Sequence, residues 1–167
     1  ALLTLYEFTL GLYIKEGNPK DISGIQDLTR KDIILANREK GSTSRIYLDK
    51  QLKKMQIPAS SISGYQKEFV SDFSAVAAVI DRHCDTAIGE KAVVLNAGKL
   101  DFIPLLKVPM YLVMEASSLN SPGFQALIEI TRSDEFKTAL RGQNCYYTAH
   151  TLSLIHISEP TRLQLIS

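Results

Sequence analysis

The sequence predicts an α/β domain with a parallel-rich sheet, and three observations carry this prediction. Segments typical of strands alternate with segments of helical periodicity along the chain. The length of 167 residues suits about one domain, and 45% hydrophobic with 22% charged residues is ordinary for a globular protein. No internal repeat or low-complexity stretch interrupts the alternation.

The elements of the first half follow from caps, breakers and apolar spacing. Ser23 and Gln26 have the form of a capping box, and the compact apolar run at 33–36 is typical of a buried parallel strand. The expected order is a strand at 10–14, a short helix through Leu28, a strand at 33–36, and a helix bearing Leu48, Leu52 and Met55 that ends before Pro58.

The second half continues the alternation. A helix capped by Ser71 or Asp72 is expected to share one face among Phe73, Val76, Ala77 and Ile80. The remaining expected elements are strands at 65–70, 86–89, 101–106 and 111–114, a helix at 91–97 closed by Gly98, a helix opened by Ser121 and Pro122, and a short helix from Ser133.

Charge and cysteine usage exclude several function classes. A formal net charge of +1 provides no large basic field, so direct nucleic-acid contact is not expected. Cys84 and Cys145 form no CxxC pair, so neither a metal site nor a cofactor is predicted. No apolar run approaches the roughly 18 residues that would cross a bilayer, and no membrane association is expected.

Both ends of the chain have unusual sequences. The chain begins Ala1-Leu2-Leu3-Thr4, without Met or a signal-peptide pattern, which predicts a cytoplasmic fragment whose true start lies upstream. Residues 152–162 read LSLIHISEPTR, which resembles the in-frame translation of a transposase sequencing adapter. Residues 151–167 are therefore expected to be an artefactual or disordered tail, and His156 and Glu159 to carry no chemistry.

The most promising site is the polar loop NREKGSTSR at 37–45, between a strand and a helix. Unpaired amides at such a helix start favour an anion, and Ser42, Thr43, Ser44 and Arg45 are the candidate ligand-binding residues. The alternative is a plain helix cap in which Arg45 pairs with Asp49 one turn later.

The other candidates are weaker. Ser71 begins a second helix and is a fifth candidate ligand-binding residue, although Asp72 beside it would repel an anion. The ligand-type residues at 82–85 point in different directions on a helix and are expected to be structural. No nucleophile, base and oxyanion hole come together in the sequence, so no catalytic residue is predicted.

Taken in order, several motifs resemble the PBP-like domain family, a type 2 periplasmic-binding-protein-like module related to molybdate-binding proteins. The family form N-R-x-x-G-S-G-T-R-x-x-L-D resembles 37–49, with Thr43 in place of the second glycine. Where relatives read Tyr-Asp-Leu, this chain has Met110-Tyr111-Leu112. The other matching segments are 12–20, Asp27-Leu28, 75–79, 85–89, 100–105 and 146–148.

The resemblance implies one complete lobe plus part of a second, with ligand bound between lobes. It implies a crossing strand at 1–17, lobe two at 18–108 and a return to lobe one at 109–150. The implied function is non-catalytic binding and sensing of a small ligand, either an oxyanion such as molybdate or tungstate or an anionic metabolite, in a transcriptional regulator whose fused upstream domain precedes Ala1. The alternatives are the C-terminal module of a molybdenum cofactor biosynthesis enzyme and a transporter substrate-binding protein.

Overall fold

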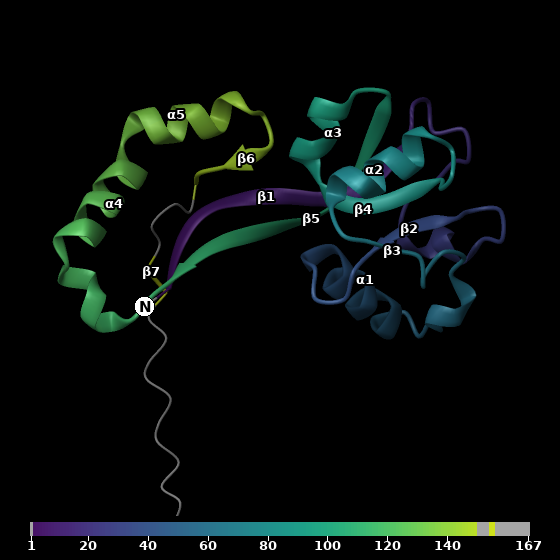
Figure 1. Cartoon of the computed structure of the whole chain (residues 1–167), viewed down its shortest axis with the longest axis horizontal. Coiled ribbons are helices and arrows are strands. Elements are labelled where there is room, and N and C mark those ends of the chain that lie inside the picture. Colours follow the sequence, from purple (N-terminus) through teal and green to yellow (C-terminus); the bar gives the residue numbers. More distant parts are fainter. Residues whose placement is uncertain (1, 150–153, 156–167) are drawn as a thin grey trace, which may run out of the picture. The chain divides into compact units, whose positions relative to one another are not determined.

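The computed structural model describes residues 2–149 and 154–155, and it confirms the predicted α/β class (Figure 1). The described residues divide into two compact units, residues 8–108 and residues 2–7 with 109–149 and 154–155. The strands are β1 (Leu2–Lys15), β2 (Leu35–Arg38), β3 (Glu68–Phe69), β4 (Thr86–Glu90), β5 (Leu100–Val113), β6 (Tyr146–Tyr147) and β7 (Leu154–Ile155). The helices are α1 (Thr43–Lys54), α2 (Asp72–Ile80), α3 (Lys91–Ala97), α4 (Pro122–Arg132) and α5 (Asp134–Gly142), with 3₁₀ turns η1 (Ile25–Thr29), η2 (Ala59–Ser61) and η3 (Ala116–Asn120).

The sheet has the order β3-β2-β4-β1-β5, and β6 and β7 also pair with β1. Strands β3, β2 and β4 are parallel, while β1 runs antiparallel to β4. The sheet is therefore mixed, with its parallel part confined to the 8–108 unit. In Figure 1, α2 and α3 lie on one side of these strands and α1 lies on the other.

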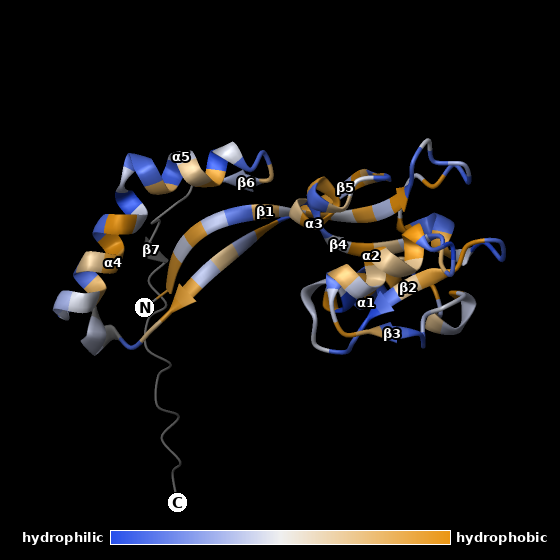
Figure 2. Ribbon diagram, turned by 45° about the horizontal axis from the view of Figure 1, so that its top comes forward, coloured by the Kyte–Doolittle hydropathy of each residue, from blue (hydrophilic) through white to orange (hydrophobic). Residues whose placement is uncertain are grey.

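The core of the 8–108 unit forms between α2 and the parallel strands. Ala75, Val76 and Val79 of α2 are buried against Ala36 of β2 and Ala87 of β4. Figure 2 shows this as hydrophobic colouring along β4 and α2. Small side chains at these positions let the helix approach the sheet closely and fill the space between them.

The expected buried face of α2 is wrong in part. Phe73 is 66% exposed and Ala77 is also exposed, whereas Ala75, Ala78 and Val79 are buried. Apolar spacing predicts the buried face of a helix only when the other faces are polar, and almost every residue of α2 after Asp72 is apolar. The sequence pattern therefore fits several faces, and the face that packs on the sheet is known only from the structure.

Several strand predictions also differ from the structure: the expected strand at 10–14 extends over Leu2–Lys15, and the expected strand at 65–70 is only Glu68–Phe69. The expected strand at 33–36 lies at 35–38, two residues later, and the expected strands at 101–106 and 111–114 are one strand, β5. Pro104 and Pro109 suggested an interruption, but β5 ends the strand order, and an edge strand tolerates proline because one row of its amides faces away from the ladder.

The second unit contains α4 and α5, which pack against each other. The ring of Tyr6 meets the ring of Tyr146 edge-on with centroids 5.0 Å apart. Most of the predicted tail at 151–167 lies outside the described residues, and Leu154 and Leu3 are register partners in the pairing of β7 with β1. Among the described residues, no helix is both long and apolar enough to cross a membrane.

Candidate functional site

Three helices of the 8–108 unit begin at the same edge of the sheet. Helices α1, α2 and α3 directly follow the parallel strands β2, β3 and β4, so all three N-termini lie at the carboxyl edge. In open α/β sheets this edge is where ligands bind, because helix starts present unpaired N–H groups and partial positive charge there. The predicted loop at 37–45 lies at this edge.

The start of α1 combines a satisfied cap with open donors. The Arg45 amide donates to Ser42 Oγ at 3.2 Å, and Ser42 Oγ donates to the Glu39 carbonyl at 2.9 Å. Within residues 2–149, no protein acceptor receives the amides of Gly41, Thr43 or Ser44. Gly41 and Thr43 are exposed, so these orphan donors at the helix start are accessible to a ligand.

Gly41 has a backbone conformation that suits this arrangement. Its φ is +93°, a region that side chains rarely adopt, and a Cβ there would meet no atom within 4 Å. The glycine therefore serves the turn and not a tight packing contact. Successive amides around such a left-handed residue form a concavity that suits an anion.

Arg45 braces the turn and does not point out of it. It is 3% exposed; its Nε donates to both oxygens of Asp49 at 3.1 and 3.2 Å, and its Nη1 pairs with Glu68 at 3.2 Å. Nη1 also donates to the Arg38 carbonyl at 3.3 Å, and the guanidinium lies 4.1 Å from the centre of the Tyr65 ring. Burial favours a lower pKa for Arg45, but the contacts with Tyr65 and Asp49 outweigh it and raise the pKa.

These contacts match the alternative in which Arg45 pairs with Asp49, and the role of Arg45 as a ligand-binding residue stays a prediction. Ser44 is buried as well, so only its backbone amide remains a candidate donor. Of the four residues predicted in this loop, Ser42 and Thr43 have side chains that reach the surface of the turn.

The start of α2 is already occupied by a carboxylate. Ser71 caps the helix by accepting the Ser74 amide at 3.1 Å. Asp72 forms an ion pair with Arg38, accepts the Glu90 amide at 3.3 Å, and lies 3.5 Å from the Tyr13 hydroxyl. The Asp72 carboxylate therefore pairs with donors outside α2, and its negative charge disfavours an anion at the start of that helix. Helix α1 has no acidic residue in its first turn, so its start is the more favourable of the two for an anion.

Two exposed apolar side chains flank the same edge; Val70 was not singled out from the sequence, and Phe73 was expected on a packed helix face. Val70 is 81% exposed and Phe73 is 66% exposed, on either side of Ser71. The Glu39 amide donates to the Phe69 carbonyl at 3.2 Å, which ties this segment to the α1 turn. Val70 directly precedes the Ser71 cap and Phe73 lies in the first turn of α2, so both lie outside the packed face of the helix. Their positions next to the predicted cap were visible in the sequence.

Within the segment at 82–85, Asp85 has a structural role. Asp85 receives Lys15 at 3.1 Å, Lys20 at 2.9 Å and the Ile34 amide at 2.9 Å. Burial alone would raise the pKa of Asp85, but these three hydrogen bonds lower it below its ordinary value. The described residues contain no group of three His, Cys, Asp or Glu side chains that could hold a metal ion.

The chain matches the model of the PBP superfamily domain over residues 1–132. It is 35% identical to the uncharacterized protein YvgK of Bacillus subtilis over 145 residues, covering 87% of this chain and 46% of that protein. It is also 33% identical over 110 residues to an uncharacterized protein from the 5′ region of a ferredoxin gene of Clostridium pasteurianum, covering 66% of this chain and 97% of that protein. The chain thus spans about half the length of the Bacillus relative.

Solved structures resemble the fold at low identity. The substrate-binding domain of a proposed molybdenum ABC transporter of Clostridium difficile has a TM-score of 0.62 at 16% identity, over 87% of this chain and 66% of that one. Peb3 of Campylobacter jejuni has a TM-score of 0.60 at 20% identity, over 87% and 67%. These neighbours are type 2 periplasmic-binding-protein folds, which confirms the predicted fold. With the family model covering most of its length, the chain belongs to the PBP superfamily domain family.

Proposed function

We propose that the 8–108 unit binds a small anion reversibly at the α1 turn, without chemistry on the ligand. The observation that carries the proposal is the set of amides at Gly41, Thr43 and Ser44 that have no acceptor among the described residues, at the carboxyl edge of a substrate-binding-type fold. Ser42 and Thr43 add hydroxyl groups, and the macrodipole of the twelve-residue α1 favours negative charge.

The leading ligand class is a tetrahedral oxyanion such as molybdate or tungstate. Such an ion accepts several hydrogen bonds within a small volume, which suits convergent amides and hydroxyls. The solved neighbour described as part of a molybdenum transporter supports this class.

An anionic metabolite with an apolar body is the second candidate, because Val70 and Phe73 are exposed beside Ser71. Inorganic phosphate and phenyl phosphate share a head group and separate the two classes. If the apolar body matters, Phe73→Ala will weaken phenyl phosphate binding and leave phosphate binding unchanged. If neither affinity changes, the metabolite version fails.

The decisive variant for the α1 turn is Thr43→Pro. Proline is tolerated as the first residue of a helix and removes the amide donor there. Ser42 has ψ of 150°, the extended conformation that a residue before proline requires. Thr43→Ala is the matched control, because it removes the hydroxyl and keeps the amide.

Isothermal titration with molybdate, tungstate, sulfate and phosphate measures the effect. Loss of one hydrogen bond to a charged ligand raises Kd about tenfold to a hundredfold in Thr43→Pro. Thr43→Ala is expected to change Kd by about threefold or less, because a hydroxyl bond is weaker and water can replace it. Flat titrations with all four ions would remove the oxyanion class, and an unchanged Kd in Thr43→Pro would place the anion elsewhere.

For the larger protein we propose a cytoplasmic transcriptional regulator in which ligand binding shifts the population of an attached domain. The reading frame upstream of Ala1 tests this directly. A helix-turn-helix domain there supports a regulator. A large molybdopterin-binding domain would favour the cofactor-biosynthesis enzyme, and a signal peptide would favour a transporter receptor.

A further inference from the structure

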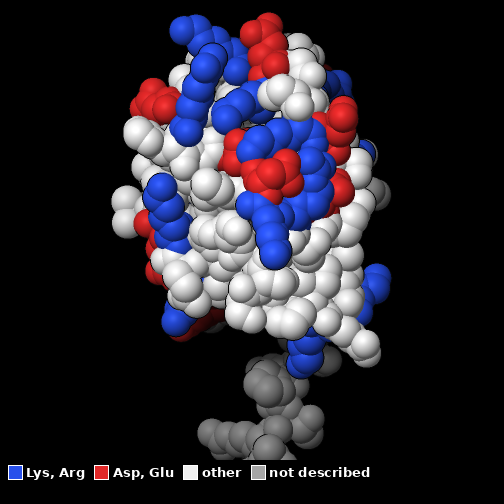
Figure 3. Space-filling view, turned by 90° about the vertical axis from the view of Figure 1, so that its right-hand side faces the viewer, with Lys and Arg blue, Asp and Glu red and all other residues white. Residues whose placement is uncertain are grey.

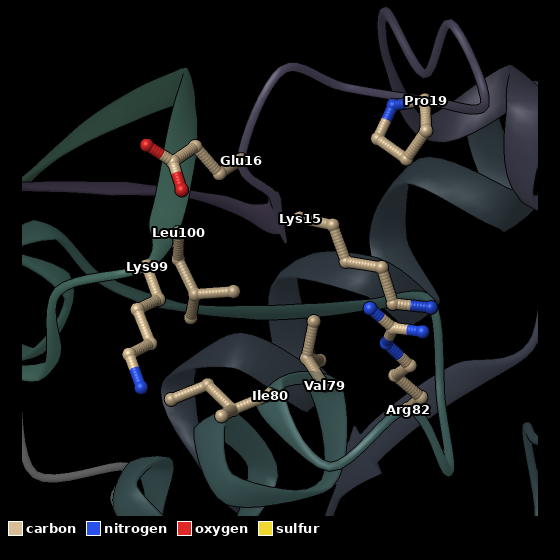
Figure 4. A pocket seen from close by; sticks show the side chains of 8 residues that line it. All are labelled: Lys15, Glu16, Pro19, Val79, Ile80, Arg82, Lys99 and Leu100. Atoms are coloured by element: carbon tan, nitrogen blue, oxygen red, sulfur yellow. The ribbon is translucent and has the colours of Figure 1, made fainter.

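A second hollow lies at the opposite edge of the same sheet. Its volume is about 650 Å³, within the usual size of small-molecule sites. Ile14 pairs with Thr86, the first residue of β4, so the end of β1 lies at the amino edge of the parallel strands, away from the α1 turn. The hollow is lined by Lys15, Glu16, Pro19, Val79, Ile80, Arg82, Lys99 and Leu100 (Figure 4).

The hollow contains two cations that no described residue neutralises. Arg82 and Lys99 are exposed, and neither side chain has an ion pair or hydrogen bond with any residue in 2–149. Lys15, in contrast, is paired, because its Nζ forms an ion pair with Asp85 Oδ1 at 3.1 Å. Glu16 is the one carboxylate among the lining residues. The lining therefore has an excess of positive charge.

Several charged side chains elsewhere on this unit lie beside opposite charges. Figure 3, viewed from the side where α1 and α2 lie in Figure 1, shows Lys and Arg gathered in the upper part of the surface with Asp and Glu among them. The ion pairs of Arg30 with Asp32 and of Lys20 with Asp85 are examples, each at 2.9 Å. Lys50 on α1 is also exposed without an ion pair to any described residue, so what distinguishes the hollow is that two such cations line one concave, partly apolar surface.

The hollow also offers an apolar surface. Val79 is fully buried, and Ile80 and Leu100 are half-buried. In Figure 4, Lys15 and Arg82 extend toward one side of the hollow, and Lys99 and Glu16 lie on the other. A ligand that fits needs an apolar body over Ile80 and Leu100 and an anionic group directed to Arg82.

We propose that this hollow is a second binding site, for a small organic anion with an apolar body. Arg82 holds the anionic group through its planar fork of donors, and Lys99 adds positive charge from the other side. The hollow shares no lining residue with the α1 turn, so the two binding proposals are tested independently.

A purely structural role for the two cations makes a different prediction. Arg82 and Lys99 follow the ends of α2 and α3 with φ of +62° and +59°, and cations at helix C-termini are favourable with the macrodipole. If this were their whole role, neutralising them would lower stability and leave ligand affinity unchanged. Affinity and thermal stability must therefore be measured on the same variants.

The probe is anilinonaphthalene sulfonate, with uncharged phenylnaphthylamine and inorganic sulfate as matched partial ligands. Fluorescence titration of the protein and of Arg82→Gln, Lys99→Gln and Lys50→Gln gives each affinity, and Lys50, exposed on α1, is the control. We expect Kd for the sulfonate to rise about tenfold in Arg82→Gln and about threefold in Lys99→Gln. Lys50→Gln is expected to leave it unchanged, and phenylnaphthylamine to bind all variants equally.

Amide chemical shifts of the labelled protein locate the probe. Shifts centred on Gly98, Leu100 and Arg82 support the site. Shifts centred on the α1 turn, equal sulfonate affinity in all variants, or a lowered melting temperature with unchanged affinity would each overturn the proposal. If inorganic sulfate displaces the probe at an equal concentration, the apolar surface of Ile80 and Leu100 contributes nothing to affinity, and the proposed ligand class is wrong.

Discussion

Replacing Arg45 by methionine keeps a long stem in the same space and removes every polar contact of the guanidinium. The bond to the Arg38 carbonyl contributes about 1 kcal/mol, and the stacking on Tyr65 about 1 kcal/mol. The pairs with Asp49 and Glu68 add little, because those carboxylates are 45% and 36% exposed and regain water. Arg45→Met is therefore expected to lower the free energy of unfolding by about 2–3 kcal/mol.

Arg45→Lys is the matched variant. It keeps the charge and the stem but loses the planar fork, so we expect a loss of about 1 kcal/mol. Urea denaturation followed by circular dichroism measures both changes, and titration with molybdate at a temperature well below the transition measures affinity. Because Arg45 is 3% exposed and faces inward, the Kd for molybdate in Arg45→Lys should stay within about twofold.

One result would refute this reasoning. If Arg45→Lys keeps full stability and weakens molybdate binding about tenfold, the guanidinium faces the ligand and the bracing role is wrong. If Arg45→Met is as stable as the parent protein, the contacts around Tyr65 contribute no net stability. Tyr65→Phe, which keeps the ring and removes the hydroxyl that donates to Asp49 at 2.7 Å, checks that stacking carries part of the effect.

Gly64→Ala is expected to lower the free energy of unfolding by more than about 2 kcal/mol, because φ is +87° and a Cβ would lie 2.1 Å from the Leu35 carbonyl oxygen. Gly17→Ala, with φ of +74° and no atom near the new Cβ, should lower it by about 1 kcal/mol. Equal losses for the two variants in urea denaturation would refute the predicted collision at Gly64. The lowered pKa of Asp85 means that the stability it contributes is present above about pH 4 and is lost as the pH falls through its pKa in the folded protein. Asp85→Asn should therefore be less stable than the parent protein at neutral pH and should lose less stability in acid. Parallel curves of unfolding free energy against pH for the two proteins would contradict this. Ser71→Ala should cost about 1 kcal/mol as a lost cap, while a change in molybdate affinity without loss of stability would make Ser71 a ligand residue.

The sequence predicted most elements because their signals are local. Ser133 was expected to start a helix, Ser71 was one of two expected caps, and Ser42 lay in a run of three possible caps; each accepts a backbone amide in the structure. Two expected caps were wrong: Ser121 makes no side-chain cap hydrogen bond, and Gly24 instead of Ser23 precedes the turn at Ile25–Thr29. The helix at 91–97 was predicted with its observed bounds, and it ends at Gly98. Caps and turns act through residues a few positions apart, so the sequence contains both partners.

The predictions that were wrong concern features that depend on contacts with segments distant in the sequence. The extent of β5 through Pro104 and Pro109 depends on its place at the edge, which no neighbouring residue specifies. The buried face of α2 depends on which side meets β2 and β4. The lobe boundaries and the ligand-binding role of Ser42, Thr43, Ser44, Arg45 and Ser71 stay predictions.

The sequence by itself determined the alternation of elements, the caps and the polar turn before α1, because each follows from backbone chemistry over a few residues. Only the tertiary structure decided that Arg45 turns inward onto Tyr65, that Asp72 occupies the neighbouring helix start, and that Arg82 and Lys99 line one hollow. Each of these depends on segments brought together by strand pairing, and the energy of a charge is set by what the fold places around it.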